Sequence, residues 1–203
     1  MRRSALRLVV FALALVAAGC ASTRVVHEWS NSDYPSAHFK RIIVFGISKQ
    51  PGIRRSFEDE FVAKLKAMGV DAVPGYRFVP EDGPVEEARL REAVGQAGVD
   101  GTLVTRLIRV EQKSQVSYVY YPMAPGLGFY GGYANAWFGY YEPPVVYQYD
   151  VYISETSLYD APKNQLVWSG TVETLPQGIS KDISRYVETV IDALKKKNLL
   201  AAG

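Results

Sequence analysis

The sequence predicts an α/β domain built on a single mixed sheet, with elements in the order β-α-β-α-β-β-β-α. Two observations predict this fold class. In the first half of the chain, short apolar runs alternate with segments of helical period, as they do where crossover helices join parallel strands. In the second half, segments of period two follow one another directly, which requires antiparallel pairing. We therefore expect helices packed on one sheet, parallel in its first half and antiparallel in its second.

The first half supplies two strand–helix pairs. Arg41 to Ile47 is a β-branched apolar run, typical of a strand buried on both faces. The helix predicted from Pro51 to Gly69 begins with a proline and ends with a glycine. Val70 to Val73 predicts the second strand, and Asp82 to Gly98 the second helix. The apolar face of the first helix is predicted to hold Ile53, Phe57, Phe61, Leu65 and Met68.

The second half supplies three strands and a helix. Leu103 to Val116 begins apolar and then alternates with charged residues, which indicates one solvated face or an edge. Val145 to Ser154 alternates with period two, and the turn Asp160 to Asn164 leads into a strand from Gln165 to Glu173. The last helix has a predicted cap at Ser180. Its apolar positions follow the helical template, at Ile183, Tyr186, Val187, Val190, Ile191 and Leu194.

Residues 1–19 are predicted to be a cleaved export signal. Three arginines precede the uninterrupted apolar run Leu8 to Ala18, which is too short to span a bilayer as a helix. Small residues then lead to Cys20, the one cysteine of the chain. This tail resembles the lipobox of bacterial lipoproteins, although Ala17 departs from the usual leucine. The resemblance implies that Cys20 carries diacylglycerol, with a fatty acid such as palmitate on the new amine, and that this lipid anchors the protein to a membrane.

Residues 20–39 are predicted to be the lipidated cysteine and a polar tether, and residues 40–203 a single α/β domain. Without residues 1–19 the chain has 20 basic and 21 acidic side chains, because the signal holds three arginines and no acid. Such a balance gives no electrostatic reason to expect nucleic acid binding. The residue after Cys20 is Ala21, not the aspartate that signals retention in the sorting rule of enteric bacteria. Resemblance to that rule implies a location at the periplasmic face of the outer membrane.

The sequence nominates no catalytic residue, metal ligand or cofactor site. His27 and His38 lie in or near the predicted tether, without acids or cysteines at metal-binding spacing. The nucleophile elbow, the phosphate-binding loop and the zinc protease motif are all missing. Arg55 and Glu58 have the i, i+3 spacing of an ion pair on a helix surface. We therefore expect a protein that binds rather than an enzyme.

Several stretches together resemble a family of bacterial envelope lipoproteins to which no activity is assigned. They are Trp29, the pair Asp33-Tyr34, RIIVFGIS, Arg55 with Phe57-Glu58, GVDAVPGYRFVP, GVDGTLVTRL and SLYDAPKNQLVWSGTVET. The order of elements also resembles the α/β domains of three other groups: the curli secretion channel lipoprotein, the lipoproteins that activate penicillin-binding proteins, and the amino-terminal domain of the Tol system's periplasmic propeller protein. The resemblance implies an envelope location and this fold.

An insertion rich in glycine and aromatic residues is predicted at about 120–144, between the third and fourth strands. Three interpretations remain open. A membrane-inserting hairpin would need longer strands than Pro122 and Pro125 allow. A partly ordered loop is the plainest interpretation. A recognition surface is the third, because large amphipathic rings dominate binding hot spots. Its candidate residues are Phe129, Tyr130, Tyr133, Trp137, Phe138, Tyr140 and Tyr141.

These observations predict a lipid-anchored periplasmic binding or scaffold lipoprotein that serves cell-envelope assembly or maintenance. Its expected partner is an envelope protein or a glycan that contacts the aromatic insertion. The alternative is an oligomeric secretion or pore component resembling the curli channel lipoprotein. Sizing in native detergent would distinguish the two, since the alternative requires a large ring.

Overall fold

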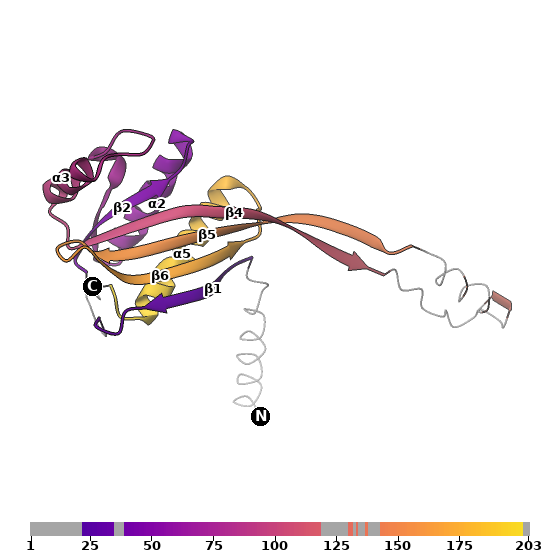
Figure 1. The fold of residues 1–203 in the computed structure, drawn as a ribbon. Helices are drawn as coiled ribbons and strands as arrows, with labels where there is room; N and C mark the ends of the chain where they lie inside the picture. The colour runs from indigo at the N-terminus through magenta and orange to yellow at the C-terminus, as the bar shows by residue number, and fades with distance from the viewer. Residues whose placement is uncertain are drawn as a thin grey trace, which may run out of the picture. The chain divides into compact units, whose positions relative to one another are not determined.

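The computed structural model describes residues 22–34, 39–118 and 143–200, and within the insertion residues 130, 131, 133 and 137. This part of the chain forms one sheet of six strands, in the order β1-β6-β5-β4-β2-β3, with three α-helices (Figure 1). The strands are β1 Thr23–Ser30, β2 Arg41–Ile47, β3 Asp71–Pro74, β4 Gly101–Ser117, β5 Val145–Asp160 and β6 Gln165–Thr174. The helices are α2 Pro51–Ala67, α3 Glu87–Ala97 and α5 Ile179–Lys196, with a 3-10 turn η1 at Gly75–Arg77.

The sheet is mixed, as predicted. β2 pairs in parallel with β3 on one side and with β4 on the other. β6 pairs antiparallel with β5 and with β1. The predicted hairpin turn also forms, because β5 ends at Asp160 and β6 begins at Gln165. There Asp160 Oδ1 accepts a hydrogen bond from the backbone N–H of Lys163, with 2.8 Å between the oxygen and the nitrogen. Asn164 takes the left-handed conformation that closes the turn.

The two faces of the sheet are covered differently. α2 and α5 pack on one face, here called the covered face, and enclose the larger core, which includes Val44, Leu103 and Trp168. α3 packs on the other face, here called the open face, and encloses a smaller cluster around Phe45 and Ala93. Since successive side chains of a strand point to opposite faces, the same strands supply both clusters.

β1 corrects the prediction that the residues after Cys20 form a tether. Thr23–Ser30 is instead an edge strand, paired antiparallel with β6. The register shifts between Val25 and His27, so a β-bulge breaks the period-two pattern that would have identified the strand. The strand is fixed from the core side, where the indole N–H of the buried Trp168 donates to Glu28 Oε1 at 2.8 Å.

α2 begins at Pro51 as predicted, but the face that it buries is partly charged. Its buried residues are Arg54, Glu58, Phe61 and Leu65. The predicted surface pair of Arg55 with Glu58 is therefore wrong, because Glu58 is fully buried and pairs with Arg54, one helical turn away. Arg55 lies outside, with its guanidinium 6.0 Å from the centre of the Tyr76 ring.

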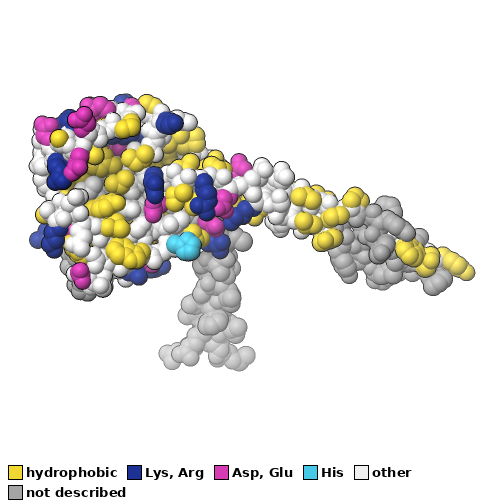
Figure 2. Space-filling view, in the orientation of Figure 1, with side chains coloured by type: hydrophobic (Ala, Val, Ile, Leu, Met, Phe, Trp, Pro, Cys, Tyr) yellow, Lys and Arg dark blue, Asp and Glu magenta, His cyan; other side chains and the backbone are white. Residues whose placement is uncertain are grey.

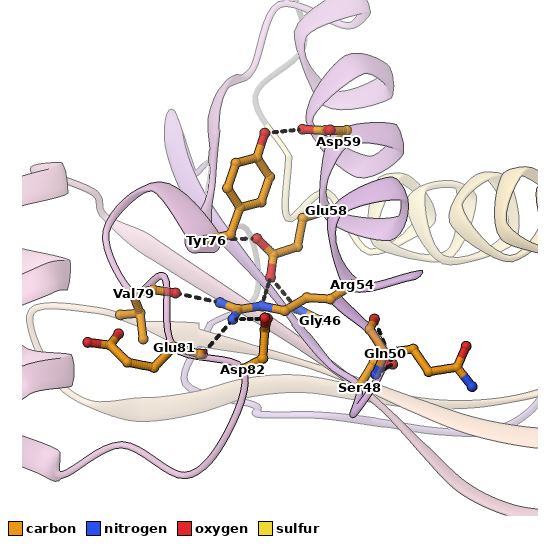
Figure 3. Close-up of polar contacts among 10 residues, drawn as sticks. All are labelled: Gly46, Ser48, Gln50, Arg54, Glu58, Asp59, Tyr76, Val79, Glu81 and Asp82. Carbon is orange, nitrogen blue, oxygen red and sulfur yellow. Dashed lines mark hydrogen bonds and ion pairs between the residues drawn. The ribbon is translucent and has the colours of Figure 1, made fainter. Parts of the chain in front are cut away.

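The carboxylate of Glu58 completes the hydrogen bonding of two backbone segments (Figure 3). Oε1 accepts the Gly46 N–H at 3.0 Å and the Arg54 Nε–H at 2.9 Å, while Oε2 accepts the Tyr76 N–H at 2.7 Å. β3 ends at Pro74, so Glu58 supplies the acceptor that β2 and η1 need beyond the end of that short strand.

Arg54 fixes the segment between η1 and α3. Its guanidinium donates to the carbonyl oxygens of Val79 at 2.8 Å and Glu81 at 2.7 Å, and to Asp82 Oδ1 at 3.1 Å. Burial opposes the positive charge, but the hydrogen bonds and charges of Glu58 and Asp82 outweigh it, so the pKa of Arg54 lies above its usual value. The buried pair therefore sets the path of the chain that leads to the open face.

The chain divides into two compact units. Unit 1 consists of Met1–Arg109 with Tyr152–Gly203, and unit 2 of Val110–Val151. β4 and β5 each continue from unit 1 into unit 2. The insertion predicted at about 120–144 lies within unit 2.

Candidate functional site

Three of the seven predicted partner-binding residues lie in the described part of the chain, and all three are exposed. The exposed fractions are 87% for Tyr130, 58% for Tyr133 and 44% for Trp137. The rings of Tyr133 and Trp137 meet edge to face, with centroids 6.2 Å apart. The other four, and the predicted lipid attachment site, lie outside the described residues: Phe129, Phe138, Tyr140, Tyr141 and Cys20.

The strands of unit 2 carry two exposed apolar rows. On the β4 side the row consists of Val110, Val116 and Tyr118, and on β5 of Val145, Tyr147 and Tyr149. Within each row the residues are spaced by even numbers, so they point to the same side of their strand.

The contacts between β4 and β5 in unit 1 show how these rows align. Thr105 Oγ1 lies 2.6 Å from Thr156 Oγ1, and Arg106 pairs with Glu155 at 2.8 Å. Even-numbered residues of β4 therefore lie opposite odd-numbered residues of β5. Continued along the strands without a bulge, this register would place both apolar rows, together with Gln112 and Ser114, on one face of the unit 2 hairpin. The other face holds Glu111, Lys113, Gln148 and Asp150, with Val146 as its apolar member.

An amphipathic two-stranded hairpin is incomplete as a structure by itself. Two strands are marginally stable in water unless a further layer covers their apolar face. Exposed apolar surface of this extent marks interaction sites. The hairpin that carries the predicted aromatic residues is thus suited to contact another surface.

Unit 1 contains a groove that was not predictable from the sequence pattern. It lies on the open face between α3 and the ends of β2, β4 and β5, with a volume of about 480 Å³. Phe45, Val94 and Val104 line it, together with Ile47 and Leu90, which are exposed by 62% and 37%. Its volume lies in the range of ligand-binding pockets, about 300–1,000 Å³. The sequence pattern placed Ile47 in a strand buried on both faces and Leu90 within the second predicted helix, so nothing in it distinguished the walls of the groove from the core.

The charges around this groove are paired. Glu87 and Arg91 on α3 form an ion pair one turn apart, and in the β5–β6 turn Asp160 Oδ2 lies 3.7 Å from Lys163 Nζ.

The surface over β1, β6, β5 and β4 mixes hydrophobic side chains with charged ones (Figure 2).

The covered face carries a buried chain of hydroxyl groups. Thr156 Oγ1 lies between Thr105 Oγ1 and the Tyr186 hydroxyl, 2.6 Å from the first and 2.8 Å from the second. Burial raises the pKa of Tyr186 far above its usual value, against the opposing effect of the two threonine hydroxyls. The phenol therefore stays neutral, and the chain joins β4, β5 and α5 as a structural link.

The described residues hold no group of three or more histidine, cysteine, aspartate or glutamate side chains placed to bind a metal ion. Among the helices of this part of the chain, none is both long and apolar enough to cross a membrane.

No protein-family model and no curated protein matches the sequence. Among solved structures, the chain is similar to two of PelC from Paraburkholderia phytofirmans, both described as dodecamers. They share 14% and 16% sequence identity with it, at TM-scores of 0.45 and 0.48, over 89% of this chain and 98% or 99% of PelC. It is also similar to the lipoprotein GNA1162 from Neisseria meningitidis, at 13% identity and a TM-score of 0.40, over 77% of this chain and 98% of that one. Similarity at this level assigns neither a family nor an activity.

Proposed function

We propose that this protein is a lipid-anchored binding or scaffold protein of the bacterial cell envelope, held by Cys20 at the periplasmic face of the outer membrane. It acts by binding, without catalysing a reaction, in the assembly or maintenance of the envelope. The observation that carries the proposal is the apolar face of the unit 2 hairpin, with Val116, Tyr118, Val145 and Tyr147 exposed. The signal layout before Cys20 supports the anchor.

The composition of the hairpin favours a macromolecular partner over a small ligand. Its apolar face is extended rather than concave, whereas small molecules are held in pockets that enclose them. Tyrosine and tryptophan rings contribute large contact areas at low entropic cost, which suits a protein or glycan surface. The neutral balance of charge in residues 20–203 argues against recognition by long-range electrostatics.

In-cell photocrosslinking tests the partner contact. A photoreactive amino acid at Tyr147, on the apolar face of the hairpin, is expected to capture a discrete partner. The matched control is the neighbouring position Gln148, on the opposite face, which is expected to capture little. Tyr130 and Trp137 provide two further positions in the insertion. Equal capture from Tyr147 and Gln148, or none from any of these positions, would contradict the proposal.

The anchor is tested separately, by labelling cells with a palmitate analogue. The wild-type protein is expected to incorporate the label and to fractionate with outer membranes. Cys20→Ser is expected to lose both the label and the membrane association, because Cys20 is the chain's only thiol. Label retained in the Cys20→Ser protein would overturn the anchor and leave the hairpin contact standing.

The length of the hairpin strands favours a second candidate, an oligomeric secretion or pore component. β4 and β5 have 17 and 16 residues, longer than the sequence predicted, and both continue into unit 2, where they carry the exposed apolar rows. Copies that line up such hairpins would shield the apolar faces from water. Sizing of the protein extracted in mild detergent distinguishes the candidates: a large ring supports the second, and a monomer or small oligomer supports the first.

A further inference from the structure

The open face of unit 1 carries an aligned row of side chains beyond the groove. Trp29 on β1 lies opposite Ser169 on β6, which lies opposite Ser157 on β5. The two serine hydroxyl oxygens are 3.4 Å apart, and the Trp29 side chain is 50% exposed. The aromatic ring of Trp29 therefore lies at one end of a row that continues with two short hydroxyl side chains. From β1 to β5 this row spans two strand spacings, about 10 Å.

The neighbouring row makes this surface a connected polar network. His27 lies opposite Thr171, and Thr171 lies opposite Glu155. Ser169 Oγ donates to Glu155 Oε1 at 3.2 Å, while Arg106 binds the other carboxylate oxygen at 2.8 and 3.0 Å. Hydroxyl, carboxylate and guanidinium groups are thus held next to one another on this surface, where they can both donate and accept hydrogen bonds.

The charges of this surface cancel in pairs. Arg106 pairs with Glu155, and on the adjoining strands Arg24 pairs with Glu173 at 2.9 Å. The groove at the far side has its own pair, Glu87 with Arg91. An anionic ligand such as a phosphate would meet a carboxylate beside every arginine, so the electrostatics suit a ligand without net charge.

The edges of the sheet are poorly suited to a peptide partner. β1 is interrupted by its bulge, and β3 has four residues and ends in Pro74, both of which obstruct the addition of a strand. A ligand of unit 1 therefore lies across the strands rather than along an edge. From β1 to β2 this path covers four strand spacings, about 19 Å, and it ends in the groove walled by Ile47 and Leu90.

We propose that the open face of unit 1 binds a neutral glycan chain, which stacks on Trp29, lies over Ser169 and Ser157 and extends toward the groove beside α3. Sugars combine C–H groups on the faces of their rings with hydroxyl groups at the rim, and this surface offers an aromatic face beside a network of polar groups. The site is separate from the unit 2 hairpin, so it stands whether or not that hairpin contacts a partner.

Affinity electrophoresis tests the site with the full-length protein in mild detergent. The gels contain one neutral polysaccharide each, namely dextran, laminarin, galactomannan or hydroxyethyl cellulose, with alginate as the anionic comparison. At least one neutral polymer is expected to retard the wild-type protein. Trp29→Ala is expected to weaken that retardation at least about tenfold, as loss of a hot-spot aromatic does, and Trp29→Tyr to preserve most of it. Ser157→Leu, which places a larger side chain in the row, is expected to weaken it as well.

The control is Ile179→Ala, which removes an exposed large apolar side chain from α5, on the covered side of the sheet and outside both proposed binding surfaces. It is expected to leave retardation unchanged, whereas equal loss in Ile179→Ala and Trp29→Ala would place the contact elsewhere and overturn the site. Mobility unaffected by every neutral polymer, or retardation by alginate alone, would overturn the neutral glycan. Melting temperatures of the variants, compared with wild type, separate loss of binding from loss of folding.

Discussion

The two faces of the sheet are built from the same strands but are covered by helices of different length. On the covered face, α5 runs for 18 residues and buries Trp168 and the hydroxyl chain that ends at Tyr186. On the open face, α3 has 11 residues, so it is about 16 Å long against about 27 Å for α5. It covers the area around β2, and no other helix in the described part of the chain packs on the open face over β5, β6 and β1. Helix length, more than the composition of the strands, thus decides which face provides stability and which remains available for binding.

The largest expected effect lies under the covered face, at the buried ion pair. Arg54→Met removes the partner of a fully buried carboxylate, and breaking such pairs costs about 3–5 kcal/mol. The neighbouring substitution Arg55→Met is the control, because that side chain is exposed, and we expect it to change stability by less than about 0.5 kcal/mol. Urea unfolding measures both. Similar costs for the two variants would show that Glu58 does not depend on its helical partner.

A glycine on each side of the sheet gives the next comparison. A Cβ on Gly170 would clash with the Trp168 ring on the covered face, so Gly170→Ala is expected to cost about 1–3 kcal/mol through overpacking. Gly95, in α3 on the open side, has nothing within 4 Å of the same position. Gly95→Ala is therefore expected to stabilise by about 0.5–1 kcal/mol. Differential scanning calorimetry measures the two shifts, and a shift of the same sign in both variants would contradict this difference.

Tyr186→Phe tests the hydroxyl chain and predicts a pH dependence. At neutral pH the lost hydrogen bond to Thr156 costs about 1 kcal/mol. The folded-state pKa of Tyr186 is raised, so the neutral phenol favours folding below the unfolded-state pKa of about 10, and the wild type loses that contribution as pH rises above it. Tyr186→Phe lacks this group and should lose stability less steeply above pH 10. Urea titrations from pH 7 to 11 measure the slopes, and parallel slopes would refute the assignment.

The smallest effect is expected on the open face itself. Ile47→Ser changes an exposed groove wall, so we expect a cost of less than about 0.5 kcal/mol. Ile43→Val, on the same face of β2 but under α3, deletes one methylene from a fully buried side chain and should cost about 0.5–1.5 kcal/mol. Thermal melting compares the two. A larger loss for Ile47→Ser would mean that the groove wall supports the fold.

The sheet and its helices were predictable because their hydrophobic periods are long and regular. β1 was not, since the bulge after Val25 disrupts its alternation and it contributes one half-buried valine to the core. The predicted apolar face of α2 does pack on the larger core, through Phe57, Phe61, Leu65 and Met68. The buried pair Arg54–Glu58 beside it was missed because charged residues are rarely buried.

The candidate binding surfaces follow from relations that no single segment contains. The groove is lined by residues of α3, β2, β4 and β5, and the row from Trp29 to Ser157 depends on the register that β6 shares with β1 and with β5. The apolar rows of unit 2 were visible as alternation in each strand. That both rows share one face required the contacts of Thr105 and Arg106 across β4 and β5.

The pairing of β1 with β6 has a consequence for the order in which the protein forms. Arg24 and Glu173, which join the two strands, are 149 residues apart in sequence. In a chain that leaves the ribosome or a translocation channel amino end first, β1 cannot pair with the sheet until β6 has also emerged. Until then Trp29 and its neighbours remain an unpaired segment, open to chaperones and proteases. The strand that follows the predicted anchor is therefore among the last to join the sheet.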